Sequence, residues 1–222
     1  MAVLEILRRL QGLGEALWDV KSQLLLGVQE TSEGTMKAFI LRIAPSEVDR
    51  VPLALEIDHL IIGWSDARDL LDPALDWPAF RQIVHDTYYG EESTYGRSGR
   101  AAGNMWRFVR EMNPGDLVVV PRWADCYIAR VVGPAFHDEA SITDDNAYRR
   151  PASWLNDKRP IPRRYARAAL QSRMKVRQTC ADASDLLSDI EDLLAIAESG
   201  RVPSFAADLR RRLQEQALNE LR

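Results

Sequence analysis

Apolar residues recur at three- and four-residue spacing near the start of the chain, and gather into short runs in its middle. Over residues 3–31 they form one stripe, which predicts an amphipathic helix. The residues of the stripe are Val3, Ile6, Leu7, Leu10, Leu13, Leu17, Val20 and Leu24. A stripe of this kind must be buried, either against the rest of the protein or against a second copy of itself. We therefore predict that residues 1–35 are a separate N-terminal helical segment.

The central part of the chain alternates strand-like and helical runs. Helices are expected over 77–88 and 104–112, with a glycine-bearing loop over 90–103 between them. Short strands are predicted over the runs rich in β-branched and aromatic residues, which are 36–43, 57–64, 117–121, 126–132 and 148–155. Short strands that follow one another closely favour an α+β fold built on a small, mostly antiparallel β-barrel flanked by helices. We assign this barrel to residues 36–180.

The pattern becomes helical again from Asp182 onward. One apolar face ends near Gly200, and a last helix is predicted to begin near Phe205. Residues 181–222 are therefore expected to form a C-terminal helical pair. A pair of this kind is commonly an assembly element, for example of a homodimer, or a connector to a further domain such as a nuclease effector.

Composition narrows the class of protein. The hydrophobic fraction is 46% and the charged fraction is 28%, as in an ordinary folded chain. No apolar run reaches the roughly 18 residues of a membrane span, and the N-terminus lacks the cleavage site of a secretory signal. The two cysteines, Cys126 and Cys180, are too few for a disulfide framework or a zinc site. These features indicate a cytoplasmic protein with no membrane partner.

The charge is unevenly distributed along the chain. The formal net charge is −4, which by itself argues against a nucleic-acid partner. Residues 149–177, however, contain ten basic side chains and one acid, Asp157. A local positive field of this kind attracts phosphate groups even in an acidic protein. The candidate phosphate-binding residues are Arg149, Arg150, Lys158, Arg159, Arg163, Arg164, Arg173, Lys175 and Arg177.

Sequence motifs of common enzymes are missing. The chain has no glycine-rich phosphate loop followed by lysine, no Gly-x-Ser-x-Gly element, and no strand-borne acid followed by Glu-x-Lys, as a metal-dependent nuclease would need. The three histidines are scattered and have no spacing suited to zinc. We therefore expect neither a catalytic residue nor a metal or cofactor in this chain.

Aromatic residues near strand ends are the most distinctive feature. Trp64 is predicted to lie where a strand ends, beside Ser65 and Asp66, and Trp123 lies in the predicted hairpin. Phe136 and Tyr148 flank a polar loop. An aromatic face beside polar groups can hold a base that has left its duplex, because stacking contributes about 1–3 kcal/mol per base. The same residues could instead simply close the barrel core.

Three segments carry a resemblance to a known family. They are Ile62-Gly63-Trp64-Ser65 with Asp69-Leu70; Phe108-Val109-Arg110-Glu111-Met112-x-x-Gly115-Asp116 with the apolar run after it; and Tyr148-Arg149-Arg150-Pro151 with Trp154-Leu155-Asn156. Together they resemble the YTH/EVE-like branch of the PUA superfamily, in the form found ahead of Mrr-type and McrB-type restriction nucleases. The resemblance covers residues 36–180.

The resemblance implies a small β-barrel that flips a modified base into an aromatic cage. Trp64-Ser65 matches the Trp-Ser pair that supplies the first wall of the cage in YTH domains. For the second wall Trp123 ranks ahead of Phe136 and Tyr148. The asparagine that YTH readers place upstream of the tryptophan has no counterpart here, so Asp66, and after it Asn104, are the candidates to read the base edge.

These observations lead to one main hypothesis and two alternatives. The main one is a DNA-binding sensor in a methylation-dependent restriction system, with N6-methyladenine favoured over 5-methylcytosine as the base that it reads. Its partner would be methylated duplex DNA. The alternatives are an RNA-binding module of the PUA type and a helical assembly protein that recognises no base.

Overall fold

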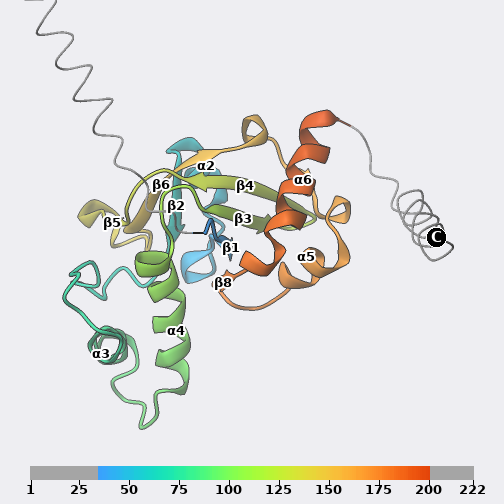
Figure 1. The fold of residues 1–222 in the computed structure, drawn as a ribbon. Coiled ribbons are helices and arrows are strands. Elements are labelled where there is room, and N and C mark those ends of the chain that lie inside the picture. Colours follow the sequence, from blue (N-terminus) through green and yellow to red (C-terminus); the bar gives the residue numbers. More distant parts are fainter. Residues whose placement is uncertain (1–34, 201–222) are drawn as a thin grey trace, which may run out of the picture. The chain divides into compact units, whose positions relative to one another are not determined.

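The computed structural model describes residues 35–200, which form an α+β fold (Figure 1). This confirms the predicted fold class at that level. The helix predicted over 3–31 and the last helix, predicted from Phe205, lie outside the described residues.

The described chain contains eight strands and five α-helices. The strands are β1 (Ala38–Leu41), β2 (His59–Ile62), β3 (Leu117–Arg122), β4 (Asp125–Val131), β5 (Phe136–His137), β6 (Tyr148–Trp154), β7 (Ile161–Pro162) and β8 (Cys180–Asp182). The α-helices are α2 (Val51–Glu56), α3 (Trp77–Tyr88), α4 (Gly96–Trp106), α5 (Ala168–Arg173) and α6 (Leu187–Ser199). A π-helical turn, η2 (Arg107–Glu111), extends α4. Single 3-10 turns are η1 (Pro45–Glu47), η3 (Glu139–Ser141), η4 (Asn156–Lys158), η5 (Arg163–Tyr165) and η6 (Ser184–Leu186).

The strands form one curled, mixed sheet with the order β2-β6-β4-β3-β1-β8. β1 runs parallel to β3, and the other pairs of this path are antiparallel. In β6, the half up to Pro151 pairs with β2 and the half after it pairs with β4, so the strand changes partner at Pro151. β2 and β8 end the path without pairing with each other within residues 35–200. The sheet is thus a curled, mixed half-barrel and not plainly the expected small, mostly antiparallel, PUA-like barrel.

Both faces of the central strands are buried. Along β3, Val118 and Val120 point into a core shared with α2, α3 and α4, whereas Leu117 and Val119 point into a second core shared with α5 and α6. Figure 1 shows α3 and α4 on one side of the fold and α5 and α6 on the other. A strand that is buried on both faces is expected to be continuously apolar, which accounts for the run at 117–120.

Two local predictions were wrong. The stretch 90–103, predicted to be a loop because of its glycines, includes the first two turns of α4. β8 was not predicted, and it is attached to α4 and to η2 through one side chain of each. Asn104 accepts a hydrogen bond from the backbone N–H of Cys180 (3.0 Å), and Arg107 donates to the carbonyl of Cys180 (3.4 Å). Tertiary contacts of this kind outweigh the low helix propensity of glycine.

Candidate functional site

The Trp64 loop (residues 63–69) follows β2 and has a strained backbone. Trp64 has φ of +65° and Asp69 has φ of +64°, in the left-handed region that side chains rarely adopt. The Trp64 indole is half-buried and packs against the main hydrophobic core. Non-glycine residues in this region persist only where the surroundings hold them, and they cluster at functional sites.

The carboxylate of Asp145 holds this loop in place. It accepts hydrogen bonds from the hydroxyl of Ser46 (2.8 Å) and from the backbone N–H of Ser65 (2.9 Å). Glycine suits position 63, because a Cβ atom there would lie 2.7 Å from Asp145 Oδ2 and 3.1 Å from Pro45 Cβ and would force one of them to shift. Asp145 thus joins three loops at one point.

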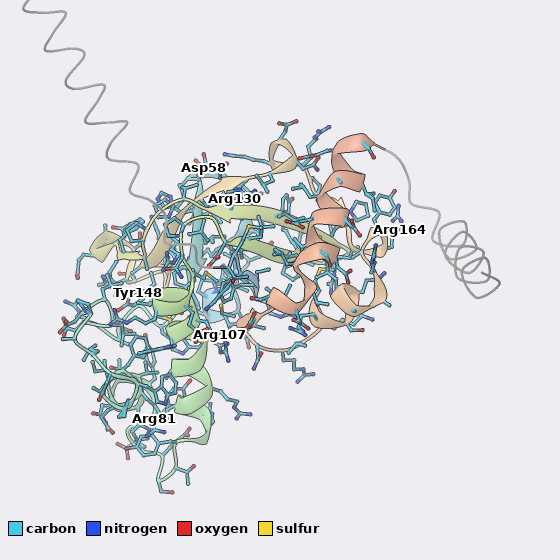
Figure 2. The ribbon with its side chains drawn as sticks, in the orientation of Figure 1. Asp58, Arg81, Arg107, Arg130, Tyr148 and Arg164 are labelled. Carbon is cyan, nitrogen blue, oxygen red and sulfur yellow. The ribbon has the colours of Figure 1, made fainter. Side chains whose placement is uncertain are left out.

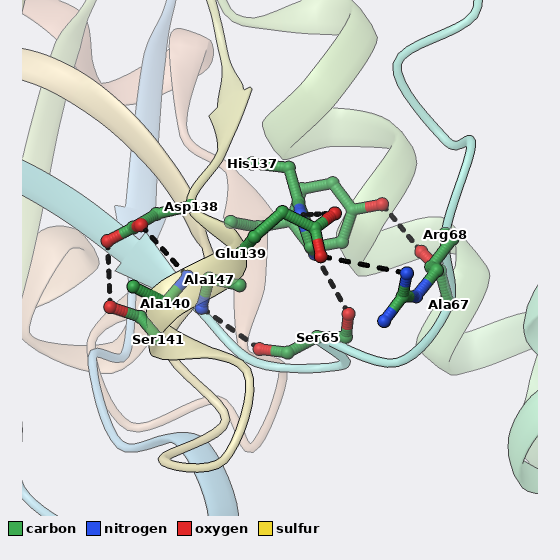
Figure 3. Close-up of polar contacts among 10 residues, drawn as sticks. Ser65, Ala67, Arg68, His137, Asp138, Glu139, Ala140, Ser141 and Ala147 are labelled. Carbon is green, nitrogen blue, oxygen red and sulfur yellow. Dashed lines mark hydrogen bonds and ion pairs between the residues drawn. The ribbon is translucent and has the colours of Figure 1, made fainter.

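Ser65 and Tyr148 are supports of the loop and offer no surface to a ligand; Figure 3 shows the surroundings of Ser65. Each is only 1% exposed. The Ser65 hydroxyl accepts a hydrogen bond from the N–H of Ala147 (3.0 Å), and the Ser65 carbonyl accepts one from His137 Nε2 (2.9 Å). Tyr148 Oη donates to the carbonyl of Ala67 (2.5 Å). The expectation that these two side chains contact a base is therefore wrong for this structure. Whether the Trp64 indole contacts one stays a prediction.

The surroundings of the Trp64 loop are acidic. Asp66 is exposed, and its backbone N–H donates to Tyr88 Oη (2.8 Å). Burial of the Tyr88 hydroxyl raises its pKa to about 12. The arginines around the loop are already paired with carboxylates. These pairs are Arg68–Glu139 (3.6 Å), Arg149–Asp138 (3.0 Å) and Arg50–Asp144 (3.3 Å). This part of the surface is therefore a poor candidate for binding phosphates.

The other predicted base-contacting residues are not gathered around Trp64. Asn104 is buried and bonded to the edge of β8. Phe136 packs edge-to-face on His59, with ring centroids 5.3 Å apart. Trp123 is 76% exposed in the two-residue loop between β3 and β4, and its carbonyl accepts from Arg163 (3.0 Å). The structure thus does not bring Trp123 to Trp64 as the opposite wall of one cage.

The nine predicted phosphate-binding cations separate into three groups. Arg150 is 3% exposed and donates to three backbone carbonyls, and Arg149 is tied to Asp138, so neither faces a ligand. Three more are paired with carboxylates, namely Lys158 with Asp58, Arg159 with Asp157 and Arg173 with Asp185. The remaining four have no carboxylate within ion-pair distance in the described part of the chain: Arg163, Arg164, Lys175 and Arg177.

Of these four, Arg163 contacts the hairpin tip directly, through the carbonyl of Trp123, and Arg164 follows it in the chain. Two further cations that the sequence reasoning missed link the tip to the turn that carries Lys175 and Arg177. Arg122 places its guanidinium 4.2 Å from the centre of the Trp123 ring, and Arg42 donates to the carbonyls of Met174 and Val176, beside Lys175 and Arg177. Burial, and after it the nearby Arg163, lower the pKa of Arg42. We define the hairpin-tip surface as Arg42, Arg122, Trp123, Arg163, Arg164, Lys175 and Arg177.

The position of the missed cations explains why the sequence did not reveal them. Arg122 adjoins Trp123 and would have been found by a search for cations beside the predicted hairpin tip. Arg42 is 121 positions before Arg163 in the chain, and only the pairing of β1 with β3 brings it near. Figure 2 shows that Arg164 and Tyr148 lie on different sides of the fold, so the hairpin-tip surface and the Trp64 loop are separate.

The described residues offer no metal centre or membrane span. Between residues 35 and 200, no three His, Cys, Asp or Glu side chains gather so that they could hold a metal ion. None of the helices in the same range has the length and apolar character needed to cross a membrane.

Comparison with known proteins gives one match. A family described as "Domain of unknown function (DUF8426)" matches residues 48–180, more than half of the chain. The matched range includes the Trp64 loop and most of the hairpin-tip surface. No curated protein and no solved structure matches the chain.

Proposed function

Because the chain belongs to the DUF8426 family, whose function is unknown, we propose from its own geometry that it binds DNA through the hairpin-tip surface. The observation that carries the proposal is the exposed indole of Trp123 among cations. A 76% exposed tryptophan gives up the free energy that its burial would contribute. A ligand that covers the face of the Trp123 indole would recover that free energy. If the ligand also carries phosphate groups, these can contact the cations of the hairpin-tip surface.

The chemistry of the surface suits a nucleic acid. Arg122 lies over one region of the indole, and Arg163 fixes the backbone of Trp123, so the ring is positioned before any ligand arrives. Five of the six cations have no carboxylate partner within residues 35–200, and their charge is available to phosphates, although Arg42 and Arg163 also donate to backbone carbonyls. The sixth, Arg122, is paired with Asp49 (2.9 Å). Five phosphate contacts predict a slope of about −4.5 for log K against log salt, which is about a 500-fold loss of affinity between 50 and 200 mM.

The proposal extends to the reading of a modified base. The support for this part is the resemblance of residues 36–180 to YTH/EVE-like domains. We propose N6-methyladenine ahead of 5-methylcytosine as the base, and a methylation-dependent restriction system, with a nuclease as effector, as the setting. The chain itself then acts as the sensor.

A binding panel tests the proposal. Fluorescence anisotropy would compare duplexes with N6-methyladenine, 5-methylcytosine or no modification, at 50 and 200 mM salt. The variant Trp123→Ala is expected to lose about tenfold in affinity, since one stacked base contributes about 1–3 kcal/mol. Trp77→Ala is the matched control, because that indole is also at the surface, on α3, and packs edge-to-face on Trp106.

Three outcomes would contradict parts of the proposal. Equal affinities for all duplexes would reject base reading. An unchanged affinity of Trp123→Ala would reject the hairpin tip as the contact surface, and loss of base preference in Trp64→Ala alone would move base reading to the Trp64 loop. Tighter binding of a structured RNA in direct competition would make the protein an RNA-binding module instead.

A further inference from the structure

A pocket of about 190 Å³ lies between the segment 156–165 and the last turn of α6. Its lining includes Pro160, Pro162 and Tyr165, together with the polar residues Asn156 and Arg159. A cavity of about 150 Å³ can hold a benzene molecule, whereas drug-sized ligands occupy about 300–1,000 Å³. The pocket therefore has room for one planar ring system.

The lining combines flat apolar surface with a hydrogen-bonding edge. The Tyr165 ring is half-buried, and Arg164 places its guanidinium 5.0 Å from the ring centre. Arg159 uses Nε and Nη2 for hydrogen bonds to Asn156 and Asp157, whereas its Nη1 makes none with any described residue. A ring that stacks on Tyr165 can therefore present an acceptor atom to Arg159 Nη1.

The backbone beside the pocket is strained. Asn156, Asp157 and Lys158 are three consecutive non-glycine residues in the left-handed region, with φ of +53°, +53° and +59°. Lys158 clamps this turn, since its ammonium group lies 2.7 Å from Asp58 Oδ1 and donates to the carbonyl of Leu55 (2.7 Å). Strained turns that are held by their surroundings are typical of ligand-binding sites.

The pocket and the hairpin-tip surface share one segment of chain. Pro162 pairs with Asp125, and the backbone N–H of Arg163 donates to the carbonyl of Ala124 (2.9 Å). Arg163 and Arg164 thus stand between Trp123 and the pocket wall. A base in the pocket would have its own phosphate within the field of these two guanidinium groups, neither of which has a carboxylate partner among residues 35–200.

We propose that this pocket binds a single nucleobase, stacked on Tyr165 with an acceptor edge toward Arg159. The inference rests on the proposed function, since it names where that function would place one base. The base comes either from the bound DNA, as an extrahelical nucleotide, or from a free nucleoside monophosphate. The pocket is separate from the Trp64 loop, to which the resemblance assigned the cage.

The experiment has one arm for each source. In the first, the full chain is titrated with AMP, dAMP and dCMP, and binding is followed by saturation-transfer NMR and calorimetry. In the second, a duplex carries 2-aminopurine opposite an abasic site, and both its affinity and its fluorescence are measured. The variants are Tyr165→Ala, Tyr165→Phe and Arg159→Gln. Tyr95→Ala is the matched control, because Tyr95 is likewise a tyrosine ring under a guanidinium group, that of Arg81.

We expect Tyr165→Ala and Arg159→Gln to weaken binding of the abasic-site duplex about tenfold, with Tyr165→Phe and Tyr95→Ala close to the unaltered protein. Affinity for the intact, unmodified duplex should change less than twofold. A pocket that serves a free nucleotide would show the same losses in the first arm alone.

The inference and the proposed function fail in different ways. If the protein binds DNA but neither Tyr165→Ala nor Arg159→Gln differs from Tyr95→Ala in either arm, the pocket does not bind a base and the DNA-binding proposal stands. If no duplex binds but a nucleoside monophosphate does, with sensitivity to Tyr165→Ala, the DNA-binding proposal fails and the pocket remains. If nothing binds in either arm, both fail.

Discussion

Arg150 and Arg163 are expected to respond in opposite ways to substitution. Both are arginines of the same basic segment of sequence. Arg150 is 3% exposed and donates to the carbonyls of Phe108 (2.8 Å), Gly133 (2.9 Å) and Val109 (3.1 Å). Two of these carbonyls belong to the π-helical end of α4, where the last carbonyls have no partner within the helix. Arg163 is half-buried, donates to one carbonyl and has no carboxylate partner among the described residues.

The magnitude follows from what each substitution leaves behind. Arg150→Met removes the guanidinium and leaves three buried carbonyls without a donor, at about 1–3 kcal/mol for each unsatisfied group. Burial lowers the pKa of Arg150 to about 10, so its charge is already costly to hold, and removing it offsets part of the loss. We expect a net loss of about 3–5 kcal/mol in the free energy of unfolding, or roughly 10 °C in Tm.

Arg163→Gln is expected to change the free energy of unfolding by less than about 0.5 kcal/mol, as is usual for a surface substitution. The Arg163→Gln substitution should instead weaken DNA binding. Losing one phosphate contact reduces affinity about fivefold at 0.15 M salt and makes the salt slope shallower by about 0.9. Arg100→Gln is the matched control. Arg100 is exposed on α4, and its substitution removes the same charge outside the hairpin-tip surface.

Chemical denaturation and anisotropy, measured on the same preparations, check the pair. A loss of less than about 1 kcal/mol in Arg150→Met would show that the three carbonyl bonds contribute little, and the reasoning about the end of α4 would be refuted. Equal binding by Arg163→Gln and Arg100→Gln would show that the hairpin tip is no different from the rest of the surface.

Three further predictions concern the supports of the site. Gly63→Ala should lower the free energy of unfolding by about 1–3 kcal/mol in a denaturation series, because its Cβ would lie 2.7 Å from Asp145 Oδ2; an unchanged stability would show that the loop yields. Asp145→Ala should lower the free energy of unfolding by a similar amount, because the Ser65 N–H loses its acceptor. The rate of amide hydrogen exchange at Ser65 should rise relative to the unaltered protein. Burial raises the pKa of Cys126 from 9 to about 12, so between pH 9 and about 12 the native state keeps a proton that the unfolded state releases, and the free energy of unfolding falls as pH rises. Cys126→Ala should make this fall shallower by up to about 1.4 kcal/mol per pH unit in denaturation measured across that range. An unchanged slope would contradict the raised pKa of Cys126.

Local structure was largely predictable from the sequence. The helix over 77–88 and the hairpin around residue 123 follow from periodicity and from turn residues, which act over a few positions. The exposure of Trp123 also follows, because a two-residue hairpin loop leaves little core for an indole to fill. The helical start of α4 was missed because Gly96 and Gly99 are poor helix formers by themselves.

The composition of the candidate site was not predictable in the same way. A run of basic residues in sequence says nothing about which guanidinium groups meet carboxylates or carbonyls after folding. Arg150 was grouped with Arg163 by sequence, but strand β6 directs Arg150 into the core toward the end of α4. Conversely, Arg42 belongs to the hairpin-tip surface only because β1 lies beside β3.

The sequence by itself determined the α+β class, the positions of most strands and the presence of strongly basic and aromatic segments, since these depend on propensity and on spacing over one element. Only the tertiary structure decided that Trp64 and Trp123 belong to different loop clusters, and which cations remain unpaired. The physical reason is that ion pairs, burial and register are set by residues that are distant in the chain. Their partners are known only once the sheet has curled and the helices have packed on its two faces.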